Sequence, residues 1–215
     1  MDKPKRTPVS REVKLVRKKW TQSDHQIVMG VDPGFSALGV VILERTNLGA
    51  KPKLIHAKVI ETKKPKKKAR TNLRVTNDDE RRYREIWAKL DETYGEFDPY
   101  AVGVEGFRVY QGSGAKTMAV YGGVLFWAYT RNMYPAVFLP SDLKKRFAGK
   151  QSASKFAVEE EMYPLIDGFK ATILGRDAKG KSLFPKTKRE HIADAAGHAF
   201  LMLEEIDRTR QMLGL

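Results

Sequence analysis

Hydrophobic and polar positions along the first sixty residues predict a sheet that begins with a hairpin. An apolar run over residues 27–31 ends at Asp32, which precedes a Pro-Gly turn, and a second apolar run covers residues 38–43. Short apolar runs bounded by Pro and Gly are typical of buried strands joined by a turn. Residues 54–60 supply a third strand, so the chain is predicted to start with three consecutive strands.

Strand and helix patterns alternate through the rest of the chain. Tyr83, Ile86 and Leu90 recur at helical spacing after Asp78 or Asp79, either of which can cap a helix. The pattern indicates an α/β fold, a mixed five-stranded sheet with helices on both faces. The predicted elements that follow the third strand are this helix to about Gly95, a strand over 99–105, a helix over 118–129, a strand over 136–139, a helix from Ser152 or Ser154 to Met162, and a helix over 190–210.

Charge and composition divide the chain into an arm and one domain. Residues 1–26 are rich in Lys and Arg and are expected to form a flexible basic arm, while residues 27–215 fit one domain in length. Within that domain, residues 63–74 hold seven basic residues and no acid and are interpreted as a loop. Residues 141–149 are interpreted as a basic segment, and residues 167–188, rich in Gly, Lys and Asp, as an insertion loop.

The overall charge indicates a polyanionic partner. The chain has a formal net charge of +14 and no cysteine. No stretch approaches the roughly 18 apolar residues of a spanning helix, so nucleic acid is favoured over a membrane. Without thiolates, any metal must be held by oxygen or imidazole, and the composition suits a reducing cytoplasm, with an organelle left open.

Residues at the predicted element ends carry candidate chemistry. Asp32 ends the first strand, Glu105 ends the fourth, and His191 and Asp194 stand three residues apart on the closing helix. If the two strands are neighbours, their carboxylates emerge at one sheet edge, and the helical spacing turns His191 and Asp194 toward one point. Crowded carboxylates repel, and two hard ions such as Mg²⁺ or Mn²⁺ hold them together. Such a group is typical of a nuclease, in which two ions activate a water and stabilise the leaving oxygen.

Each of these residues also has a structural interpretation. An Asp before Pro-Gly is commonly a turn former, Glu105 can be a solvated strand end, and the helical pair can be a surface contact. Their combination in this order favours a site. His191 can ligate a metal, position the water or accept its proton, and the sequence leaves these roles open. His198 lies near the same face and is interpreted as a packed or supporting histidine.

The order of these motifs resembles the RuvC-like resolvases of the RNase H-like superfamily. Met29-Gly-Val-Asp-Pro-Gly-Phe-Ser-Ala-Leu-Gly-Val40 is similar to the family's first motif, Val104-Glu-Gly-Phe107 to its second and His191-Ile-Ala-Asp-Ala-Ala196 to its last. The resemblance runs from about residue 27 to 203 and includes a basic stretch between Pro140 and Lys155. It implies an RNase H-like fold with strand order 3-2-1-4-5.

The resemblance also implies roles for individual residues. Asp32, Glu105, His191 and Asp194 take the four acidic-site positions, the third of which is Asp in some members and His in others. The family acts as a symmetric homodimer that nicks opposed strands of a four-way or branched DNA junction with Mg²⁺, for which Mn²⁺ is expected to substitute. The apolar helix over 118–129 is a candidate dimer surface. The basic stretch contributes the expected DNA contacts Lys144, Lys145, Arg146, Lys150 and Lys155.

The second motif departs from the family pattern. Members commonly have an aromatic residue three positions past the motif's Glu that wedges into the junction, whereas this chain offers Phe107, Arg108 and Tyr110 as candidates for that contact. The basic arm and the additional loops indicate a phage or otherwise divergent member. Two other functions stay open: an RNase H-like nuclease acting on RNA, a hybrid or flap DNA, and a non-catalytic nucleic-acid-binding protein on the same fold.

Overall fold

The computed structural model describes residues 24–63, 75–106 and 114–214. Most of the predicted basic arm, nearly all of the basic loop over 63–74, and the candidates Phe107, Arg108 and Tyr110 lie outside the described residues. None of the helices within the described ranges is long and apolar enough to cross a membrane.

Five strands form one mixed sheet, as predicted. The first three strands are antiparallel neighbours, and the fourth and fifth run parallel to the first. The strand order is β3-β2-β1-β4-β5, which confirms the order that the family resemblance implied. The strands are β1 (Gln26–Asp32), β2 (Ala37–Arg45), β3 (Lys53–Glu61), β4 (Ala101–Glu105) and β5 (Tyr134–Phe138).

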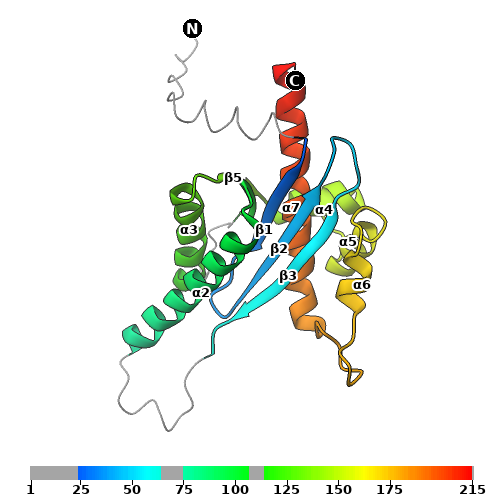
Figure 1. Cartoon of the computed structure of the whole chain (residues 1–215). Helices are drawn as coiled ribbons and strands as arrows, with labels where there is room; N and C mark the ends of the chain where they lie inside the picture. The colour runs from blue at the N-terminus through cyan, green and yellow to red at the C-terminus, as the bar shows by residue number, and fades with distance from the viewer. Residues whose placement is uncertain (1–23, 64–74, 107–113, 215) are drawn as a thin grey trace, which may run out of the picture.

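Helices cover both faces of this sheet (Figure 1). Successive side chains of a strand point to opposite faces, so Val28 joins one hydrophobic cluster and Met29 the other. The cluster of Val28 includes residues of α4 to α7, and the cluster of Met29 includes residues of α2 and α3. The helices are α2 (Val75–Phe97), α3 (Ala115–Thr130), α4 (Pro140–Ala148), α5 (Lys155–Met162), α6 (Phe169–Leu174) and α7 (Lys186–Leu213).

Two segments differ from the sequence prediction. The basic segment over 141–149, for which no helix was predicted, lies in α4 as far as Ala148, and this helix buries Leu143 and Phe147 at a four-residue spacing. The insertion loop predicted over 167–188 is wrong for two stretches, because it contains α6 and the start of α7. In α6, Phe169 and Ile173 are fully buried. Both short helices bury only one apolar pair, which polar and charged residues obscured in α4 and which the length of only six residues obscured in α6.

Three glycines let α7 lie directly on the sheet. They are Gly39 on β2, Gly30 on β1 and Gly103 on β4, and Gly30 and Gly103 are partners in the parallel ladder. A Cβ atom built at Gly30 would lie 1.9 Å from the Ala195 carbonyl oxygen, and one at Gly103 would lie 2.1 Å from that of His198. Since any side chain there would collide with the helix backbone, these glycines set the height of α7 above the strand ends.

Candidate active site

Asp32 and Glu105 emerge at the same edge of the sheet. Each is the last residue of its strand, and β1 and β4 are parallel neighbours. Val31 pairs with Val104, so the following residues, Asp32 and Glu105, leave the ladder side by side. The condition that the two strands are neighbours, which the family resemblance implied, is therefore met, and the topology brings two carboxylates together.

The third carboxylate comes from α7. Asp32, Glu105 and Asp194 each offer an oxygen, and these three oxygens lie within 4.8 Å of one another. The glycine contacts described above place Ala195, the residue after Asp194, against β1. Asp32 is 8% exposed, so this is a recessed group of acids at the end of the central strands. We call these three residues the acid cluster.

His191 contacts the acid cluster through Asp32. Its Nδ1 lies 2.6 Å from Asp32 Oδ2. The group of atoms that could hold a metal consists of the three carboxylate oxygens and does not include this imidazole. The hydrogen bond to Asp32 is the largest of the influences on the imidazole and raises the pKa of His191 above its ordinary value. The structure thus places all four predicted residues together, with His191 beside the carboxylates.

Crowding of the carboxylates shifts their protonation. Burial, followed by the hydrogen bond and the charge of Asp32, raises the pKa of Glu105 to about 9. Burial also raises the pKa of Asp194. For Asp32, burial acts upward, but hydrogen bonds with His191 and Glu105 outweigh it and lower the pKa. The cluster therefore holds a proton on Glu105 at neutral pH when no cation neutralises it.

Two predicted DNA-binding lysines lie at this cluster. Lys155, the first residue of α5, places its Nζ atom 2.6 Å from Asp194 Oδ2. Burial lowers the pKa of this ammonium, but the charge and hydrogen bond of Asp194 outweigh it and raise the pKa. Lys144 on α4 lines a small hollow together with Glu105 and His198. Leu143 seats α4 against Gly197 of α7 and so fixes the position of Lys144.

The other predicted DNA-binding residues differ in whether their side chains are paired with other described residues of the protein. Lys145 and Lys150 are exposed. Arg146 forms an ion pair with Glu204, with a nitrogen–oxygen distance of 2.7 Å, and its guanidinium lies over the Phe147 and Phe200 rings. Arg146 therefore has a structural use in joining α4 to α7, and its contact with DNA stays a prediction.

His198 matches its interpretation as a packed histidine. The ring is fully buried and stacks on Phe138 of β5, with centroids 6.4 Å apart and an interplanar angle of 10°. Burial lowers the pKa of His198 to about 4, so the ring is neutral at physiological pH. It supports the helix beneath Asp194.

Sequence reasoning missed the residues just before the last motif. Lys186, Arg189 and Glu190 occupy the first turns of α7 and border a pocket beside Lys155. The available signal was the spacing of Lys186 and Arg189 at i and i+3, which places them on one helical face. That spacing was obscured because part of it fell in the segment interpreted as an insertion loop.

Comparison with known proteins identifies the family to which this fold belongs. The family model described as crossover junction endodeoxyribonuclease RuvC matches residues 28–173, which include Asp32 and Glu105 and end before α7. A relative named crossover junction endodeoxyribonuclease RuvC, from Prochlorococcus marinus (strain AS9601), is 29% identical over 129 residues, covering 60% of this chain and 74% of that protein.

Solved structures extend the similarity to the whole fold. Thermus thermophilus RuvC has a TM-score of 0.61 and 25% identity, covering 86% of this chain and 96% of that one. A structure of the same protein in complex with a Holliday junction substrate has a TM-score of 0.61 and 24% identity, covering 87% of this chain and 96% of that one. With strand order, acid cluster and family match in agreement, the chain belongs to the RuvC family of crossover junction endodeoxyribonucleases.

Proposed function

We propose that this protein is a metal-dependent endonuclease that cuts four-way or branched DNA. The observation that carries the proposal is the acid cluster, in which β1, β4 and α7 each supply one carboxylate oxygen within 4.8 Å of the others. Membership of the RuvC family and similarity to a RuvC bound to a Holliday junction support the choice of substrate. The net charge of +14 suits a phosphate-rich partner.

The cluster fits a hard divalent cation. Carboxylate oxygens are the ligands that Mg²⁺ and Mn²⁺ prefer, and burial together with the neighbouring Asp32 raises the pKa of Glu105 to about 9, so a cation would relieve the cost of its negative charge. Asp32, Glu105 and Asp194 would hold the metal, and we propose two ions per site. When bound, such ions supply charge stabilisation for the phosphodiester and lower the pKa of water.

The chain's own residues prepare this site for the metal. His191 holds one oxygen of Asp32, which fixes the rotamer of that carboxylate and leaves its other oxygen for ligation. Lys155 neutralises Asp194 through its 2.6 Å contact. Because Lys155 and a metal ion compete for the same carboxylate, we infer that Lys155 leaves Asp194 on metal loading and becomes available to a DNA phosphate.

DNA contacts are proposed for the exposed face of α4 and its surroundings. Lys144 lies at the edge of the acid cluster, and Lys145 and Lys150 are exposed nearby along the chain. Lysines at these positions can neutralise phosphates on either side of the reacting one. Their contribution is independent of base sequence, which suits recognition of a branched shape.

A homodimer is proposed through α3. The outward face of this helix is an apolar stripe, and Phe126 and Tyr129 on it are 71% and 68% exposed. Large exposed aromatic side chains on one helix face are typical of an interaction surface. Two copies joined by a twofold axis would present two acid clusters to a substrate with the same symmetry. The stripe consists of Ala115, Ala119, Gly122, Phe126 and Tyr129.

Cleavage of defined substrates tests the proposed function. A labelled four-way junction is incubated with Mg²⁺ and the protein, beside duplex, flap and RNA–DNA hybrid of matched sequence, and strand breaks are read on a denaturing gel. We expect paired nicks on opposed strands of the junction and none with Asp32→Asn. Preferential cutting of hybrid or flap would keep the nuclease assignment but change the substrate. No cutting of any substrate would favour a non-catalytic nucleic-acid-binding protein.

A further inference from the structure

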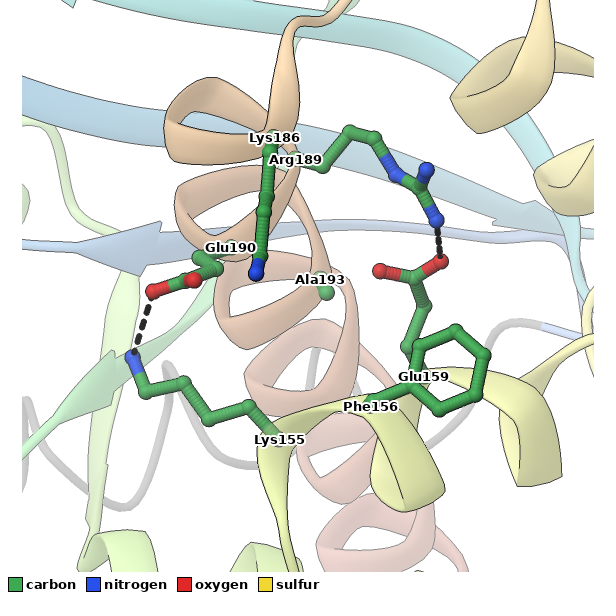
Figure 2. Close-up of a pocket in the computed structure, with 7 residues that line it drawn as sticks. All are labelled: Lys155, Phe156, Glu159, Lys186, Arg189, Glu190 and Ala193. Atoms are coloured by element: carbon green, nitrogen blue, oxygen red, sulfur yellow. Dashed lines mark hydrogen bonds and ion pairs between the residues drawn. The ribbon is translucent and has the colours of Figure 1, made fainter.

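A second pocket lies beside the acid cluster, between α5 and the first turns of α7 (Figure 2). Its volume is about 320 Å³. Lys155 belongs to both sites, since its ammonium contacts Asp194 of the cluster at 2.6 Å and Glu190 of the pocket at 3.9 Å. The pocket is therefore one side chain away from the proposed metal. Its lining residues are Lys155, Phe156, Glu159, Lys186, Arg189, Glu190 and Ala193.

Two of its cationic groups have unused capacity for hydrogen bonds. Figure 2 shows the Lys186 side chain extending along α7 into the pocket, between Glu190 and Arg189. Within the part of the chain that the structure describes, the Lys186 ammonium makes no hydrogen bond or ion pair. The Nε atom of Arg189 is buried and has no hydrogen-bond partner. Since the Arg189 Nε atom is buried, the Lys186 ammonium is the donor to which a ligand acceptor would bind.

A buried carboxylate fixes the wall that presents Arg189. The Glu159 side chain is 7% exposed and accepts hydrogen bonds from the Arg189 guanidinium and the Tyr163 hydroxyl. This ion pair joins α5 to α7 across the pocket. Since Glu159 is already engaged by two donors, it holds the guanidinium in place and leaves Lys186 as the cation facing the opening.

An exposed aromatic ring completes the pocket. Phe156 directly follows Lys155 on α5, lines the pocket and is 59% exposed. An apolar ring is not stabilised by contact with water, so its exposure leaves it available to a ligand. Proteins that bind unstacked nucleobases combine an aromatic ring, on which the base stacks, with cations that hold the backbone phosphates. The pocket combines both features.

We propose that this pocket binds one unstacked nucleotide of the DNA strand that is cut, with its base on Phe156 and its phosphate beside Lys186. The proposal rests on the proposed function, because it takes the neighbouring acid cluster as the place of cutting. A volume of about 320 Å³ admits one nucleotide and excludes a base pair in a continuous stack. The pocket therefore selects strands that can release a base near the nick, as branch points do.

Abasic substitution tests this pocket directly. A set of four-way junctions carries a single abasic linker at each position within three nucleotides of the nick, and initial cutting rates are measured. For the wild-type protein we expect one position at which loss of the base slows cutting about tenfold. Phe156→Leu should cut the intact junction about tenfold more slowly and lose the sensitivity at that position, whereas Phe156→Tyr should retain both properties.

A charge-matched pair of variants separates the pocket from general electrostatics. Lys186→Ala should slow cutting of the intact junction, while Arg84→Ala, which removes an equally charged and 80% exposed side chain from α2, should not. The proposal is overturned if no position responds in the wild-type protein. It is also overturned if Phe156→Leu keeps the full response.

The assay distinguishes this proposal from the proposed function. If the wild-type protein cuts no junction, the proposed function fails, and the pocket is judged by binding alone. For that case, 2-aminopurine replaces each base around the branch point, and its fluorescence is compared in complexes with wild-type protein and Phe156→Leu. A position whose emission is quenched only by the wild-type protein supports the pocket. Equal emission at every position contradicts it.

Discussion

The glycine contacts under α7 predict that one methyl group added at Gly30 displaces α7 and thereby impairs the proposed metal site. In Gly30→Ala, the new Cβ would lie 1.9 Å from the Ala195 carbonyl oxygen, whereas ordinary contact begins near 3.4 Å. The helix must therefore retreat by about 1.5 Å, the difference between these distances. Ala195 directly follows Asp194, so the displacement acts on the residue that supplies the third carboxylate.

The cost of this displacement differs between stability and catalysis. Overpacking of this kind destabilises a fold by about 1–3 kcal/mol, which a domain of this size can tolerate. A displacement of about 1 Å at a reacting centre reduces a rate by about a hundredfold. We therefore expect Gly30→Ala to fold, to bind Mn²⁺ at least about tenfold more weakly and to cut about a hundredfold more slowly.

Three measurements and one control check this expectation. Urea unfolding gives the loss of stability, isothermal titration calorimetry gives the Mn²⁺ affinity, and the junction assay gives the rate. Gly95→Ala is the control, since Gly95 lies in the last turn of α2 and a Cβ there meets no atom within 4 Å. That variant should keep both its stability and its activity, because the added methyl group displaces nothing. Wild-type metal affinity and cutting in Gly30→Ala would refute the reasoning.

Three further predictions concern protonation, DNA contact and assembly. Because the pKa of Glu105 rises from 4.5 to about 9 on folding, the metal-free protein binds more protons than the unfolded chain between these values. Its free energy of unfolding should fall as pH rises through that window, and Glu105→Gln should flatten the fall in urea titrations with EDTA. Replacing Lys144 and Lys145 with Ala should weaken junction binding and reduce the slope of log affinity against log salt by about two, and an unchanged slope would show that they face solvent. Phe126→Lys should convert a dimer to a monomer in analytical ultracentrifugation, and a persisting dimer would exclude the α3 stripe as the interface.

Much of the fold could be predicted from the sequence because its core elements have simple periodic patterns. The first four strands contain short apolar runs, and the long helices repeat apolar residues every three to four positions, so both could be recognised. The strand order could not be predicted from such patterns, because it depends on contacts between distant segments. It came from the family resemblance. The short helices α4 and α6 were missed, because each buries only one apolar pair, too few positions to define a helical period.

The candidate site was predicted as a set of residues, and the structure supplied their relationships. Strand ends, helical spacing and the strand order implied by the family resemblance together grouped Asp32, Glu105, His191 and Asp194, which lie together in the structure. No pattern in the sequence indicated that Lys155 would contact Asp194, because that contact depends on how α5 is seated beside α7. The pocket at Phe156 was missed for the same reason.

A crystal structure of the protein grown with Mn²⁺ would test the central claim most directly. We predict anomalous density at the acid cluster, with a metal about 2.0–2.2 Å from oxygens of Asp32, Glu105 and Asp194, and with the Lys155 ammonium moved off Asp194. Density elsewhere, with none at the cluster and Lys155 still bound to Asp194, would contradict the assignment of these carboxylates as the metal site of a nuclease.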